Sequence, residues 1–112
     1  MNIQQIGEDF FISGQIHPEN MRELAARGIR GIICNRPDNE QWGQPDFSTI
    51  RAAAQMAGIE ARYVPITHGR VTPSDEAAFR EALDSLPKPV LGYCRSGARS
   101  ASMYGAAAQR AA

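Results

Sequence analysis

Three short apolar runs, separated from one another by segments with helical periodicity, constrain the fold of this chain most strongly. The runs are "IRGIIC" at 29–34, "IEARYVPI" at 59–66 and "PVLGYC" at 89–94. Strands of a parallel sheet are buried on both faces, and each parallel pair needs a crossover connection, usually a helix. The pattern therefore predicts an α/β layer fold, in which a mostly parallel sheet is flanked by helices.

The segments between the runs carry helix start and stop signals. The clearest segment begins at Thr72, which is placed to cap a helix, with Pro73 in the first turn. Asp75 completes a variant of the capping box. Two short strands, broken near Gly7, are expected within 4–14. Helices are predicted in four ranges: 17–28, 46–58, 72–86 and 100–112.

Length, charge and cysteine content narrow the class of protein. A chain of 112 residues with 43% hydrophobic content fits a single domain spanning 1–112. Twelve basic residues balance twelve acidic ones, which argues against a nucleic-acid or membrane-surface partner. The N-terminus has no basic region followed by a long apolar stretch, so we expect no signal peptide and a cytoplasmic protein. Cys34 and Cys94 are then expected to be thiols rather than a structural disulfide.

The stretch "VLGYCRSGARSAS" at 90–102 places a cysteine between a predicted strand and a predicted helix. Sites in open parallel sheets form at the carboxyl ends of the strands. We therefore expect three loops to converge at that edge of the sheet, namely 34–46, 66–72 and 94–100. The cysteine, Cys94, opens the last of them.

The loop after Cys94 has the residue types of an anion-binding cradle. Its amides can curl into a nest, and the following helix N-terminus adds partial positive charge, so a thiol at the centre ionises more easily. Serine hydroxyls are expected to donate to the sulfur or its ligand, and the arginines to bind oxyanions. The alternative is a buried, inert cysteine followed by a solvated turn. If the loop is a functional site, Cys94 and Arg99 are predicted to be the catalytic residues. The anion-binding loop is then predicted to consist of Arg95, Ser96, Gly97, Ala98 and Ser100.

"YCRSGARS" resembles the active-site loop of rhodaneses and of cysteine-dependent phosphatases. Over nearly the whole chain, "ISGQIHPENMRELAARGIRGIICNRPDNE", "YVPI", "VTP" and "PVLGYCRSGARS" are similar, in this order, to the beta-lactamase-hydrolase-like family, a phosphatase-like domain or sulfurtransferase. The resemblance implies a single-domain fold like that of dual-specificity cysteine phosphatases, with Cys94 as nucleophile. It also implies a persulfide-handling metallo-β-lactamase-type protein as partner.

Loop length and a missing carboxylate bear on the choice between phosphate and sulfur chemistry. Cysteine phosphatases carry C-x5-R, whereas Arg99 gives C-x4-R here, and the loop "ITHGRVT" offers no carboxylic acid. We therefore predict a sulfurtransferase: Cys94 takes sulfur from thiosulfate or a persulfide, and an acceptor thiol removes it. One alternative is a phosphatase with a phosphocysteine intermediate. Another is a module that only binds anions or senses redox state.

Four further residues are candidates for accessory roles, each with a structural alternative. Arg36 and Asp38 either line the mouth of the site or form an internal ion pair, and Asp38 is one substitute for the missing acid. His68 is the other substitute, or an exposed loop histidine. Cys34 either resolves an oxidised Cys94 or packs in the core. No metal or other cofactor is expected, because the cysteines and histidines lack close ligand spacing.

Overall fold

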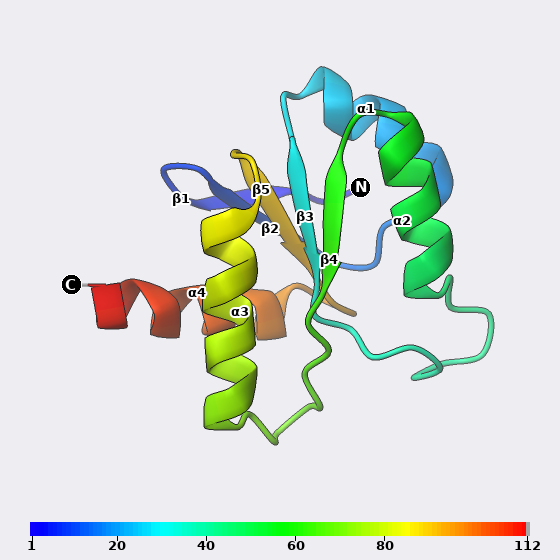
Figure 1. Cartoon of the computed structure of the whole chain (residues 1–112). Helices are drawn as coiled ribbons and strands as arrows, with labels where there is room; N and C mark the ends of the chain where they lie inside the picture. Colours follow the sequence, from blue (N-terminus) through cyan, green and yellow to red (C-terminus); the bar gives the residue numbers. More distant parts are fainter. Residues whose placement is uncertain (112) are drawn as a thin grey trace.

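The computed structural model describes residues 1–111, which form a five-stranded sheet with helices on both faces (Figure 1). The strands lie in the order β1-β2-β5-β3-β4, and only β1 and β2 pair antiparallel. The predicted α/β fold with a mostly parallel sheet is confirmed. The strand bounds are β1 Gln4–Gly7, β2 Phe10–Ser13, β3 Gly31–Cys34, β4 Glu60–Tyr63 and β5 Val90–Tyr93.

The helices follow the predicted segments, with two differences at their starts. The segment 17–28 begins with a 3-10 turn, where the Asn20 side chain accepts a hydrogen bond from the His17 amide at 2.8 Å. The last helix begins at Ala98 rather than near residue 100, and the Ser96 hydroxyl accepts from the Ala98 amide just ahead of it. The bounds are η1 Pro18–Asn20, α1 Met21–Ala26, α2 Phe47–Met56, α3 Pro73–Ser85 and α4 Ala98–Ala111. None of these helices is long and apolar enough to cross a bilayer.

Alternating side chains of the strands divide the core into two layers. Ile32 of β3 packs with α1 and α2 on one face of the sheet, whereas its neighbour Ile33 packs with α3 and α4 on the other (Figure 1). Leu91 and Val90 of β5 divide in the same way. Both faces of the central strands are therefore covered, which explains why these strands are continuous apolar runs in the sequence.

The parallel register brings the ends of the central strands together. Cys34 of β3 and Ser13 of β2 both pair with Tyr93 of β5, the last residue before Cys94. The segments that follow these strands consequently leave the sheet at one edge. This edge holds the candidate site.

Two glycine substitutions test how tightly β5 packs on the start of α4. In Gly92→Ala the new Cβ would lie 2.8 Å from Phe10 Cζ and 3.1 Å from Ser100 Cβ, so we expect a loss of about 1–3 kcal/mol in the free energy of unfolding. In Gly105→Ala, within α4, the Cβ meets nothing within 4 Å, so we expect a gain of roughly 0.5–1 kcal/mol. Urea denaturation measures both. Similar effects at the two positions would contradict the tight β5–α4 contact.

Candidate active site

The loop between β5 and α4 wraps the sulfur of Cys94. Only Arg95, Ser96 and Gly97 separate this cysteine from the helix, and the Gly97 amide donates to Cys94 Sγ at 3.0 Å. Gly97 has φ +99°, a region that glycine enters without strain. A Cβ there would also lie 3.3 Å from the carbonyl oxygen of Ser13. Glycine therefore allows both the curl of the loop and its close contact with the end of β2.

Backbone amides decide the ionisation of Cys94. Burial is the largest single influence and raises the pKa of this thiol, but hydrogen bonds from surrounding amides together outweigh it and hold the pKa below the ordinary cysteine value. The donors are the backbone amides of Ser100, Ser96, Arg99 and Gly97. The predicted cradle around an activated thiol is thus present. Cys94 itself is only 1% exposed and is not among the residues that line the cleft beside it.

The two serine hydroxyls were expected to donate to the sulfur or its ligand, and one of them has another acceptor. Ser96 Oγ accepts from the Ala98 amide at 3.3 Å and keeps its own hydrogen for a ligand in the cleft, which Ser96 lines. Ser100 is fully buried, and its hydroxyl donates to Asn35 Oδ1 at 2.8 Å. The Asn35 amide group in turn donates to the carbonyl of Val64. Both serines contribute their amides to the cradle, while the Ser100 hydroxyl holds the start of α4 to Asn35.

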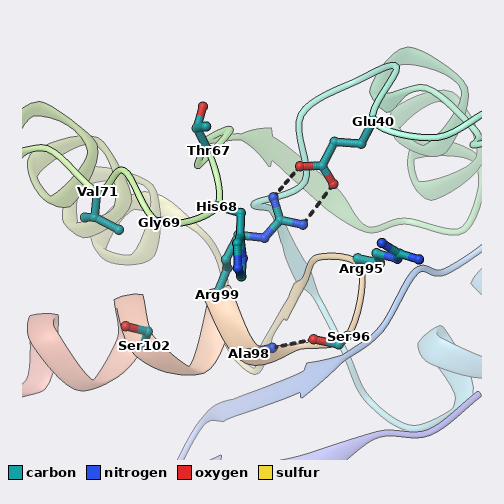
Figure 2. Close-up of a pocket in the computed structure, with 10 residues that line it drawn as sticks. All are labelled: Glu40, Thr67, His68, Gly69, Val71, Arg95, Ser96, Ala98, Arg99 and Ser102. Atoms are coloured by element: carbon teal, nitrogen blue, oxygen red, sulfur yellow. Dashed lines mark hydrogen bonds and ion pairs between the residues drawn. The ribbon is translucent and has the colours of Figure 1, made fainter.

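Arg99 faces both the thiol and a carboxylate that the sequence analysis did not single out. Its guanidinium donates two hydrogen bonds to Glu40, at 2.6 and 2.9 Å (Figure 2). It donates a third to the carbonyl of Ile66 at 2.9 Å. The bond to Glu40 is the main cause that raises the pKa of Arg99, and a hydrogen bond to Cys94 also contributes. The arginine is thereby fixed beside the sulfur.

Glu40 lies between two guanidinium groups. Besides Arg99 it accepts from Nε of Arg36 at 3.1 Å, and these contacts, chiefly the one from Arg99, lower the pKa of Glu40. Arg36 is 4% exposed and also donates to Gln15 and Gln41. Arg36 therefore forms an internal ion pair and does not line the cleft, but its partner is Glu40 and not the expected Asp38. The signal for Glu40 was a second carboxylate in "NRPDNE", four residues after Arg36.

Asp38 holds the same loop to the body of the protein. Its carboxylate accepts from the Phe47 amide at 2.8 Å, at the start of α2, and its own amide donates to the Tyr63 hydroxyl at 3.0 Å. The next residue, Asn39, has φ +65°, in the left-handed region that asparagine tolerates. The chain turns there, so Asp38 is directed at α2 while Glu40 reaches Arg99.

A cleft of about 660 Å³ opens above the cradle (Figure 2). All three loops expected at this edge contribute to it, and it includes His68 and Arg95. Its volume is in the range of small-molecule sites. The lining residues are Glu40, Thr67, His68, Gly69, Val71, Arg95, Ser96, Ala98, Arg99 and Ser102.

Cys34 is buried beside the site without lining the cleft. Its thiol donates to the carbonyl of Arg36 at 3.2 Å, and it belongs to the core cluster on the α1/α2 face. Burial, above all, raises its pKa to about 11. Cys34 is therefore a neutral thiol at neutral pH. These contacts agree with a packing role, and its action as a resolving cysteine stays a prediction.

The two thiols are expected to titrate in widely separated steps. Ultraviolet thiolate absorbance, followed against pH, should show a step below the ordinary cysteine pKa that Cys94→Ser removes. A second step, removed by Cys34→Ser, is expected near pH 11. If the Cys94 step came at or above the ordinary value, the amides would not outweigh burial.

Replacement of Glu40 by glutamine should destabilise the protein in a pH-dependent way. The change leaves the buried Arg36 without its carboxylate, and we expect a loss of about 1–3 kcal/mol at neutral pH, the usual worth of hydrogen bonds to charged groups. Because folding lowers the pKa of Glu40, its stabilising effect is present above the unfolded-chain pKa and disappears as pH falls through the folded pKa. Urea denaturation at neutral and acid pH measures the difference.

Glu23→Gln is the matched control for this experiment. Glu23 pairs with Arg27 on the surface, where the side chains are 52% and 50% exposed, so a loss below about 0.5 kcal/mol is expected. Equal losses in the two variants, or a Glu40→Gln loss that persists in acid, would contradict the bridging role of Glu40.

Sequence comparison identifies a family over almost the whole chain. Residues 2–112 match the family described as "Beta-lactamase hydrolase-like protein, phosphatase-like domain". The beta-lactamase hydrolase-like protein of Xylella fastidiosa is 38% identical over 104 residues, which are 93% of this chain and 24% of that protein. The chain thus spans about a quarter of the length of this curated relative.

Structural comparison agrees with the sequence. A crystal structure from Neisseria meningitidis, named as a phosphatase candidate, is 35% identical with a TM-score of 0.83, over 90% of this chain and 72% of that one. The core catalytic domain of the PP-IP phosphatase SIW14 from S. cerevisiae shares the fold at 17% identity and a TM-score of 0.67, over 87% of this chain and 57% of that one. The predicted cysteine-phosphatase-like fold is confirmed, and the chain belongs to the beta-lactamase hydrolase-like family as a phosphatase-like domain.

Proposed function

We propose that this domain is a cysteine-based phosphatase that hydrolyses phosphate esters through a phosphocysteine at Cys94. The observation that carries the proposal is membership of a phosphatase-like family over residues 2–112. The ring of backbone amides around an activated thiol, with Arg99 held beside it, supplies the nucleophile and the anion site that the reaction needs. Phosphate hydrolysis is therefore preferred over sulfur transfer. The sequence analysis preferred sulfur transfer, because of the loop length.

In the first step the Cys94 thiolate attacks phosphorus, so that an S–P bond forms while the P–O bond to the leaving group breaks. The cradle amides and the Arg99 guanidinium stabilise the charge on the equatorial phosphoryl oxygens. Glu40 and the Ile66 carbonyl fix Arg99 in advance, so little reorganisation is needed when the substrate arrives.

The leaving oxygen needs a proton, and the cleft offers few donors. Glu40 is the only carboxylate among the lining residues, and its bond to Arg99 lowers its pKa, so it stays ionised. His68, from the loop after β4, lines the same cleft, and the proposal assigns it the proton transfer. In the second step water attacks phosphorus, and His68 takes a proton from that water. The S–P bond breaks, which releases inorganic phosphate and regenerates the Cys94 thiolate.

Sulfur transfer through a Cys94 persulfide is the second candidate. It is favoured by the C-x4-R spacing and by the ionised state of Glu40, because a thiolate or sulfite leaves without a proton. An acceptor thiol and a persulfide-handling metallo-β-lactamase-type partner belong to this candidate. It shares the nucleophile and the cradle with the first.

One sample distinguishes the candidates. We expect the purified chain to release phosphate from aryl phosphates, and Cys94→Ser to abolish the release, because the nucleophile is lost. The intact mass of the same sample is measured after exposure to thiosulfate or glutathione persulfide. Gain of one sulfur without phosphate release would establish the second candidate instead. A chain that binds phosphate but does neither reaction would be a non-catalytic anion-binding module.

The two arginines of the loop should differ in their effect on catalysis. Arg99→Ala is expected to lower kcat/KM for phenyl phosphate about 100-fold or more, the usual loss when a donor to transition-state charge is removed. Arg95→Ala is expected to lower it less than about tenfold, because Arg95 is exposed and is not among the groups that shift the pKa of Cys94. Steady-state kinetics of both variants decide, and equal or reversed losses would show that the contact of Arg99 with Cys94 does not carry catalysis.

A further inference from the structure

Arg95 is a cleft residue without a task in the reaction described above. Its side chain is exposed and makes no hydrogen bond or ion pair with residues 1–109, whose side chains the structure describes, whereas Arg99 is held by Glu40 and Ile66. Figure 2 shows the two guanidinium groups directed to different sides of the cleft. Arg95 is thus a free cation at the rim of an anion-binding site.

The position of Arg95 in the loop sets which part of a substrate it can meet. It directly follows Cys94, so the two Cα atoms are about 3.8 Å apart. The backbone carbonyl of Arg95 accepts from the Gln15 amide at 3.4 Å, which ties this residue to the segment after β2. Its backbone is therefore anchored while its long side chain can sweep the space beside a phosphoryl group on Cys94.

The size of the cleft indicates that the substrate has an organic body. A single phosphoryl group fills only a small part of about 660 Å³, whereas this volume is typical of sites for small organic molecules. The walls on the side opposite Arg95, at Gly69 and Val71, carry no charge (Figure 2). Apart from the paired Glu40, nothing in the lining repels a second anion near Arg95.

We propose that the substrate is a small organic phosphate with a second anionic group close to the reacting one, and that Arg95 recognises this second group. The inference rests on the proposed phosphatase function for the identity of the reacting group. Arg99 serves the reacting phosphoryl, and Arg95 selects substrates by an ion pair at the rim. A carboxylate and a second phosphate share the chemistry that Arg95 can bind.

The test compares two pairs of ligands that differ only in charge. These are 3- and 4-carboxyphenyl phosphate and their carbamoyl analogues, in which a neutral amide replaces the carboxylate. Binding to Cys94→Ser, which lacks the nucleophile, is measured by calorimetry at low salt. We expect a carboxylate to bind about fivefold tighter than its amide at one of the two ring positions, and the ratio to shrink with added salt.

Three further substitutions, each made in the Cys94→Ser background, assign the effect to Arg95. The binding ratio is the affinity for the carboxylate divided by that for its amide. Arg95→Ala should bring this ratio to about one, and Arg95→Lys should retain part of it, because the charge remains. Arg51→Ala is the control for net charge, since Arg51 is exposed on α2 and does not line the cleft; its ratio should be unchanged. A ratio near one at both ring positions, or a ratio that survives Arg95→Ala, overturns the inference.

Failure of this inference and failure of the proposed function are distinguishable. The binding ratio is measured on a protein that cannot turn over, whereas phosphate release is measured on the wild-type chain. If phosphate is released but carboxylate and amide bind equally well, the phosphatase proposal stands and the role of Arg95 is wrong. If the carboxylate binds more tightly than the amide but no phosphate is released, Arg95 still selects anions and the phosphatase proposal is wrong.

Discussion

The hydrogen bonds from backbone amides to the sulfur of Cys94 are the interaction on which the rest of this structure depends. They require the chain to turn from the end of β5 into the first turn of α4 within four residues, Cys94 to Gly97. Gly97 permits that closure through its positive φ, and the Ser13 carbonyl lies against it. The pairing of β2 with β5 therefore places the Ser13 carbonyl where it would crowd a side chain at residue 97.

A second constraint is the fixed position of the cation. Arg99 comes from α4, but its guanidinium is held by Glu40, from the loop after β3, and by Ile66, from the segment after β4. Three segments that are far apart in the sequence thus meet at one side chain. Arg36 adds a buried positive charge behind Glu40, so the carboxylate stays ionised and keeps its hold on Arg99. The site is an electrostatic network rather than a loop with two free arginines.

Local patterns were enough to predict much of this arrangement. The apolar runs gave the parallel sheet, because buried strands and capped helices have distinct periodicities. The strand, cysteine, polar loop and helix that surround Cys94 gave the cradle. The Ser100 hydroxyl was misplaced, because it is fully buried and donates to Asn35 instead of to the sulfur or a ligand. This contact joins residues 65 positions apart in the sequence, so no local pattern could reveal it.

The sequence by itself determined the α/β layers, the convergence of three loops at one sheet edge and the place of Cys94 between a buried strand and a helix, since each follows from short-range periodicity or from residue type. Only the tertiary structure decided which carboxylate of "NRPDNE" reaches the cleft. Asp38 and Glu40 are equivalent in the sequence, but the left-handed turn at Asn39 sends Asp38 to the start of α2 and leaves Glu40 for Arg99. The conformation of a loop depends on the contacts at both of its ends, and those contacts join residues that are distant along the chain.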